Sequence, residues 1–153
     1  MSPAEELPPL VWATVFKIGN AKLDAQHREL AGDVNNLTRM LAEGRKWSQI
    51  VARSKRLRDK CFAHFLDEEA ILERSKYKKL VAHAGDHRSI EKQLDDILAS
   101  ISRVARPSRA QVEALRYFRS MLVHHFFRYD IAYKAHLMRT RSKGSRSRPS
   151  KTR

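Results

Sequence analysis

The chain has 153 residues, 42% of them hydrophobic, and a formal net charge of +14 at pH 7. This length suits a single domain with a substantial core, and the five glycines and five prolines are too few for a turn-rich all-β fold. The single cysteine, Cys61, excludes an internal disulfide. With no secretory signal and no window near the roughly 18 apolar residues of a membrane span, we expect a soluble cytoplasmic protein.

The positive charge is concentrated in two segments. Residues 45–60 contain seven lysines and arginines and one aspartate, and residues 139–153 contain seven lysines and arginines and no acidic residue. The rest of the chain is nearly neutral. Any interaction with a polyanion is therefore expected to involve one of these two segments.

Residues 1–22 precede the first periodic segment and are expected to form an extended N-terminal arm. Four segments then repeat apolar residues at alternating spacings of three and four, which is typical of helices that bury one side. Asp24, Ser48 and Ser108 are candidate N-caps. The four apolar seams are Leu23, His27, Leu30, Val34, Leu37 and Leu41; Ile50, Ser54, Leu57, Cys61, His64, Glu68 and Ile71; Leu80, His83, His87, Ile90, Leu94, Ile97 and Ile101; and Leu115, Phe118, Leu122, His125, Tyr129 and Ala132.

The connections between these segments are short, near residues 43–47, 75–79 and 105–108. Short links between long amphipathic helices make neighbouring helices antiparallel. The sequence therefore predicts an all-α fold, an up-down-up-down four-helix bundle over residues 23–138. Residues 139–153 contain no apolar residue and are predicted to be a disordered basic tail.

Each seam is interrupted by histidine or glutamate at positions that should be buried. A lone histidine on an apolar face is usually a hydrogen-bonded core residue. Several together are different, because each buried polar group without a partner costs on the order of 1–3 kcal/mol. A metal ion offsets this cost, since neutral imidazoles and carboxylates are its ligands. The interrupting residues are His27, His64, Glu68, His83, His87 and His125.

These residues should also meet in space. In an antiparallel bundle, the beginnings of the first and third helices lie beside the ends of the second and fourth. The pairs His64/Glu68 and His83/His87 are four residues apart, so both members share one face. Asp130 lies five residues beyond His125, about 140° around an ideal helix, which is a poor spacing for a shared face. The spacing predicts a metal site at one end of the core but does not identify the metal.

The same residues form motifs that resemble the hemerythrin family, specifically the single-domain bacteriohemerythrins of bacteria. The resemblance extends from Trp12 to about Leu137. Its motifs are Trp12 and Gly19 as W-x(6)-G, LDAQHREL at 23–30, HFLDEE at 64–69, HAGDH at 83–87 and HFFRYD at 125–130. The resemblance includes Asp130, which the helical spacing alone did not favour.

The resemblance implies a centre of two iron ions, Fe²⁺ or Fe³⁺, joined by an oxo or hydroxo bridge. His83, His87 and His125 would bind one iron, His27 and His64 would bind the other, and Glu68 and Asp130 would bridge both. The iron with two histidines would keep an open position for dioxygen. The implied function is reversible oxygen binding for transport or storage, without enzyme activity. Met121 and Phe126 depart from the family's usual tryptophan and isoleucine, which puts oxygen affinity in doubt but not iron binding.

Two other functions remain open: an enzyme acting on peroxide, nitric oxide or ferrous iron, and an oxygen or redox sensor acting through a partner. Turnover with excess substrate would identify an enzyme, and a sensor commonly has an output domain, which this chain lacks. The tail could contact DNA, RNA or an anionic membrane without sequence specificity, or merely increase solubility. Its cations are Arg139, Arg141, Lys143, Arg146, Arg148, Lys151 and Arg153.

Overall fold

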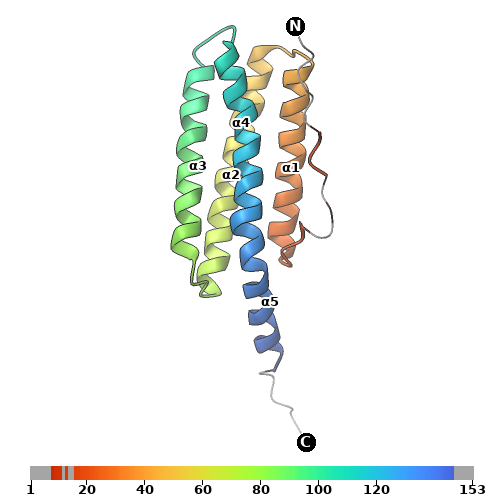
Figure 1. The fold of residues 1–153 in the computed structure, drawn as a ribbon, viewed down its shortest axis with the longest axis vertical. Helices are drawn as coiled ribbons and strands as arrows, with labels where there is room; N and C mark the ends of the chain where they lie inside the picture. Colours follow the sequence, from red (N-terminus) through yellow and green to blue (C-terminus); the bar gives the residue numbers. More distant parts are fainter. Residues whose placement is uncertain (1–7, 12, 14–15, 147–153) are drawn as a thin grey trace, which may run out of the picture.

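The computed structural model describes residues 8–11, 13 and 16–146; Trp12 and residues 147–153 lie outside the described residues. The helices are α1 (Ala21–Ala42), α2 (Trp47–Arg74), α3 (Leu80–Ile101), α4 (Arg109–His125), the π-helical turn η2 (Phe126–Asp130) and α5 (Ile131–Arg146). Because α4, η2 and α5 form one continuous rod, the molecule has four antiparallel rods (Figure 1). The predicted up-down-up-down bundle is confirmed. Within the described residues, no helix is long and apolar enough to cross a membrane.

The bundle interior has three levels along its axis. A large apolar cluster fills the end where α4 begins, with Leu57, Leu94 and Phe118 nearly inaccessible. A smaller cluster fills the opposite end around Leu23, Leu72 and Tyr133. The histidines and carboxylates of the seams lie between these two clusters. Along each helix, the polar residues come between residues of the small cluster and residues of the large cluster. The predicted polar site is therefore closed by apolar packing above and below it.

The helix starts differ in part from the predicted caps. Asn20, not Asp24, caps α1, and its side chain accepts a hydrogen bond from the Leu23 amide. Asp24 instead accepts from the amides of Ile18 and Gly19 at 2.7 and 3.1 Å, which fixes the turn before the helix. Lys46 precedes α2 without a side-chain cap, so the proposed Ser48 cap is wrong. Ser108 caps α4 as predicted, in a capping box with Gln111.

The fourth apolar seam changes phase at η2. The prediction continued from His125 to Tyr129 and Ala132, but Ala132 is exposed. The buried residues after His125 are Asp130, Tyr133 and Leu137. A π-helical turn hydrogen-bonds residues five apart, as the Ile131 amide does with the Phe126 carbonyl, and so inserts one extra residue. That extra residue shifts every later side chain by one position.

The C-terminal helix continues further than predicted. α5 extends to Arg146, so residues 139–146 of the predicted disordered tail are helical, while residues 147–153 lie outside the described residues. Arginine and lysine are good helix formers, and Leu137 holds the preceding turn in the core. Arg141 also donates to the Gly19 carbonyl at 2.6 Å. Gly19 has a φ of 95°, which favours glycine at this turn.

The described part of the N-terminal arm runs beside α1 (Figure 1). The amide and carbonyl of Leu10 both pair with the Asn35 side chain on α1, at 2.7 and 2.8 Å. Arg119 on α4 donates to the carbonyl of Pro8. The arm is thus tied to two helices of the bundle and lies over the space between them.

Candidate metal centre

All seven residues predicted as metal ligands lie in the middle level of the bundle and are buried. α1 contributes one, α2 and α3 contribute two each, and the rod of α4 and η2 contributes two. Their ligand atoms form two overlapping groups in which all atoms lie within 4.8 Å of one another. These groups are Glu68, His83, His87, His125 and Asp130, and His27, His64, Glu68 and Asp130.

The first group contains three imidazoles. Nε2 of His87 lies 3.0 Å from Nε2 of His125, so these nitrogens point to a common position. Glu68 Oε1 lies 3.5 Å from Nε2 of His87 and also contacts Nε2 of His83. Asp130 Oδ1 lies 2.9 Å from Nε2 of His125 and 3.3 Å from that of His83. Three nitrogens and one oxygen of each carboxylate therefore surround one position.

The second group contains two imidazoles and the remaining carboxylate oxygens. Glu68 Oε2 lies 3.0 Å from Nε2 of His64 and 3.6 Å from Nε2 of His27. Asp130 Oδ2 lies 3.0 Å from Nε2 of His27. Each carboxylate thus directs one oxygen to each group of imidazoles. This is the arrangement needed to bridge two metal ions.

Hydrogen bonding leaves several of the converging atoms without a partner. Both oxygens of Glu68, Oδ1 of Asp130 and both ring nitrogens of His83 are buried without a hydrogen-bond partner among the described residues. Glu68 is fully buried and His83 nearly so. Leaving such atoms unpaired costs on the order of 1–3 kcal/mol each. Nitrogen and carboxylate oxygen donors converging without hydrogen-bond geometry fit a non-haem metal site.

The outer nitrogens of three histidines have hydrogen-bond acceptors that the sequence did not single out. Nδ1 of His64 donates to Gln26 at 2.8 Å, and Gln26 in turn donates to Asp67 at 2.7 Å. Nδ1 of His87 donates to Glu69 at 2.7 Å, and Nδ1 of His125 donates to Asp86 at 2.6 Å. These bonds orient the rings with Nε2 toward the centre, as is usual for metal-binding histidines. The signal was present, because Gln26, Glu69 and Asp86 all lie within the quoted motifs.

The π-helical turn explains how Asp130 joins the site. In an ideal α-helix, Asp130 would lie about 140° from His125. With the extra residue of η2, both face inward, and Oδ1 of Asp130 lies 2.9 Å from Nε2 of His125. Such turns occur frequently at functional sites. The irregularity is therefore what brings the second carboxylate into the centre.

The carboxylates control the protonation of the imidazoles when no metal is bound. Burial disfavours charged His27, but Asp130 and then Glu68 outweigh it and raise its pKa to about 9. Burial likewise opposes the charge of His125, whose pKa Asp130 and Asp86 raise to about 9. Burial would raise the pKa of Glu68, but the surrounding imidazoles hold it well below its usual range. Glu68 is thus ionised and ready to bind a cation, which must displace protons from His27 and His125.

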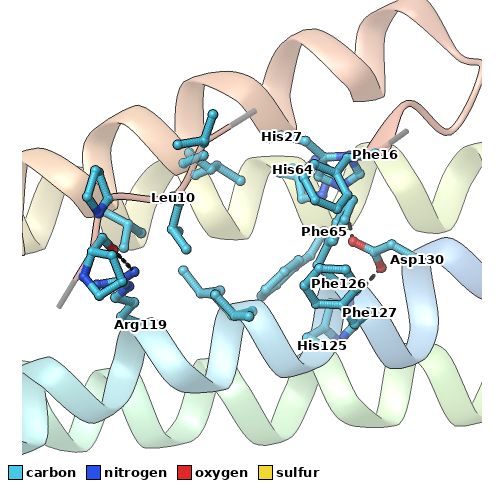
Figure 2. A pocket seen from close by; sticks show the side chains of 18 residues that line it. Leu10, Phe16, His27, His64, Phe65, Arg119, His125, Phe126, Phe127 and Asp130 are labelled. Atoms are coloured by element: carbon cyan, nitrogen blue, oxygen red, sulfur yellow. Dashed lines mark hydrogen bonds and ion pairs between the residues drawn. The ribbon is translucent and has the colours of Figure 1, made fainter. Parts of the chain in front are cut away.

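The two groups of imidazoles have different surroundings. The three-histidine group is enclosed by aromatic rings, with Phe65 stacked on His87 at 4.0 Å between ring centroids and Tyr129 stacked on His125 at 5.3 Å. Both histidines of the two-histidine group border a pocket of about 340 Å³ between α1 and α4, which only His125 of the other group also reaches (Figure 2). Phe126 meets the His27 ring edge to face at 5.0 Å at the inner end of this pocket. A small ligand can therefore reach the centre from the two-histidine side.

Two other histidines and the cysteine lie outside the site. His124 is exposed beside His125, and Cys61 is a buried core residue next to the site's apolar neighbours. His136 on α5 interacts with Ser75 instead, and its Nε2 lies 2.8 Å from the backbone carbonyl oxygen of Ser75. In the basic segment 45–60, Lys60 pairs with Glu29 and Asp33, and Arg58 pairs with Asp95. This segment is thus a solvated, partly ion-paired face of α2.

Comparisons with known proteins show the family to which the sequence is similar. The family described as "Hemerythrin HHE cation binding domain" matches residues 19–136. The chain is 27% identical to "Myohemerythrin-1" of Phascolopsis gouldii over 129 residues, covering 84% of this chain and 95% of the relative. It is 26% identical to "Myohemerythrin" of Theromyzon tessulatum over 133 residues, covering 86% and 98%. No solved structure gives a significant match.

Proposed function

Because the chain belongs to the hemerythrin family, we propose that it binds dioxygen reversibly at a non-haem di-iron centre and serves as an oxygen carrier or store. The observation that carries the proposal is the division of each carboxylate between two groups of imidazoles. Glu68 and Asp130 each direct one oxygen to the three-histidine group and the other to the two-histidine group. Two ions bridged by both carboxylates would satisfy all of these donors.

In this proposal, His83, His87 and His125 hold one iron, and His27 and His64 hold the other. An iron pair would supply the two electrons that dioxygen takes up on binding. The protein contributes an asymmetric coordination shell, because one ion has three imidazoles and the other has two. The ion with fewer ligands has room for dioxygen, and its side of the centre borders the apolar pocket.

The surroundings of the site favour binding over further chemistry. Five neutral imidazoles against two carboxylates leave the irons less electron-rich than sites dominated by carboxylates. The pocket wall beside His27 consists mainly of apolar side chains such as Leu30, Val34 and Phe126. Such a wall would exclude water and hinder protonation of the bound oxygen, whose loss as peroxide would leave the irons oxidised and end reversible binding. We therefore propose a carrier function in the cytoplasm and not an enzyme.

The test is an absorption spectrum of the reduced, iron-loaded protein before and after exposure to air. We expect a visible band that forms with oxygen and disappears under argon over repeated cycles. Multiple turnovers of peroxide, nitric oxide or ferrous iron, with a bleached spectrum that argon does not restore, would instead support an enzyme. A matched sample of His64→Ala protein should show no reversible band, because the open-site iron would lose one of its two imidazoles.

A further inference from the structure

The pocket beside the two-histidine group is larger than dioxygen requires. It has a volume of about 340 Å³ and lies between α1, α4 and the N-terminal segment (Figure 2). Its inner end is formed by His27, His64, His125 and Asp130, and its outer end by Leu10, Arg119 and Pro8, which Arg119 contacts. Between these ends the lining is mainly apolar. A volume above about 300 Å³ with an apolar wall and few polar groups is characteristic of sites for organic ligands.

Arg119 gives the outer end of the pocket a specific chemistry. One terminal nitrogen, Nη2, donates to the carbonyl of Pro8. The other, Nη1, is buried without a hydrogen-bond partner among the described residues. No carboxylate of the described residues forms an ion pair with this guanidinium. A buried N–H that needs an acceptor, on a permanently charged group, favours an anionic ligand, and a guanidinium matches a carboxylate well.

We propose that this pocket binds a medium-chain fatty acid, with its carboxylate on Arg119 and its alkyl chain directed toward His27 and His64. Charge complementarity fixes the head group, and the apolar wall accommodates the chain. A neutral diatomic gas would use neither the length of the pocket nor the buried, unpaired Nη1 of Arg119.

The length of the pocket sets the length of the chain. Arg119 and His125 are six residues apart on α4, or about 9 Å along the helix axis at about 1.5 Å per residue. Each carbon of an extended alkyl chain advances by roughly 1.3 Å, given carbon–carbon bonds of about 1.5 Å. About seven such steps, or a chain of about eight carbons, cover this distance between the two backbone positions. Decanoate, two carbons longer, is used as the probe so that its chain spans this distance in full.

One consequence rests on the proposed function. A fatty acid in this position lies between the N-terminal segment and the two-histidine side of the centre. Its alkyl chain would occupy the path by which dioxygen approaches. Decanoate should then slow oxygen uptake by the reduced, iron-loaded protein without changing its iron content.

The experiment is a calorimetric titration of the full-length protein with decanoate, with metal bound and after chelation. Arg119→Gln should weaken binding at least tenfold, as expected for the loss of a charge-assisted hydrogen bond. Arg119→Lys should retain most of the affinity. Arg116→Gln, three residues earlier on the same helix and outside the pocket, is the matched control and should bind normally. Decanol should bind at least tenfold more weakly than decanoate.

Three results would overturn the proposal. Equal affinities of wild-type and Arg119→Gln protein for decanoate would show that the guanidinium does not bind the carboxylate. Binding that occurs only with metal present would mean that the carboxylate binds the metal centre and not Arg119. An affinity that rises tenfold when residues 1–7 are deleted would mean that the chain's own N-terminus occupies the pocket. Since the titration does not depend on oxygen chemistry, its failure is distinguishable from failure of the proposed function.

Discussion

Two neighbouring levels of the bundle interior are built from the same helices but differ in the chemistry of their buried side chains. At one level, Leu57, Leu94 and Phe118 pack against each other and are almost inaccessible to solvent. At the next level, the same inward positions hold His64, Glu68 and other polar residues that are equally buried. The apolar level stabilises the fold by packing alone. The polar level contains carboxylate oxygens without hydrogen-bond partners among the described residues, and its donor atoms fit a bound metal ion.

This comparison predicts that the largest change in metal content comes from a bridging carboxylate. Glu68→Ala should remove nearly all bound metal. Both ions would lose a ligand, and the site would lose the negative charge of the Glu68 carboxylate, which attracts cations. Metal analysis of the purified variant measures this. Glu73→Ala, an exposed position on the same helix, is the control and should keep the full metal content. Retention of both ions by Glu68→Ala would exclude a bridging role.

The apolar level should respond in the opposite way. Leu94→Ala removes a buried side chain from the large cluster and should lower the free energy of unfolding by about 2–5 kcal/mol. Its folded fraction should keep the metal content of the wild type. Urea denaturation and metal analysis of the same samples measure both quantities. Leu66→Ala, at an exposed leucine, should change neither, and loss of metal from folded Leu94→Ala protein would show that the two levels are not independent.

A third prediction divides the polar level itself. His27→Ala should abolish oxygen binding but retain partial metal occupancy, because the three-histidine group stays intact. The control is His124→Ala, since that histidine is exposed and adjacent to the site in sequence only. Spectra in air and metal analysis measure the two effects. If His27→Ala lost all metal, or bound oxygen normally, the assignment of the open side to His27 and His64 would fail.

The smallest effect on the site is expected from the end of the chain. Deleting residues 147–153 removes Arg148, Lys151 and Arg153, and the protein should keep its metal, its oxygenated spectrum and its melting temperature. Its affinity for heparin or DNA should fall, with a weaker dependence on salt, if these cations contact phosphates. Deletion from residue 139 also removes the bond of Arg141 to Gly19, so only that variant should melt at a lower temperature. Undiminished DNA binding by both variants would place the polyanion contact at residues 45–60.

Most of the fold and the site could be predicted because helical spacing is regular. Seams such as His83, His87, Ile90 and Leu94 keep one phase along the whole of α3, so the pattern located both the core and the histidines. The prediction failed where the spacing itself changes. No periodicity reveals the extra residue of η2, so Tyr129 and Ala132 were assigned to the seam in place of Asp130 and Tyr133. At this turn the family motif included Asp130, which the ideal helical spacing did not favour.

The spacing of apolar residues also does not predict which of two nearby side chains caps a helix. Asn20 and Asp24 can both cap a helix, and the choice depends on the turn at Gly19, where Asp24 binds two backbone amides. The helical segment 139–146 follows from contacts distant in sequence, since Arg141 bonds to a residue of the N-terminal arm. The hydrogen-bond acceptors of the histidine rings, including Gln26, can be identified only when the positions of the rings are known. Apolar spacing does not reveal these features, because tertiary contacts contribute to each of them.

The most direct test of the central claim is the ratio of dioxygen bound to iron present. Protein produced with ample iron would be reduced, its iron content measured, and its oxygen uptake titrated. The two ligand groups predict two irons per chain and one dioxygen for every two irons, released again under argon. One zinc per chain, no iron, or oxygen that is consumed and never released would contradict a reversible di-iron oxygen carrier.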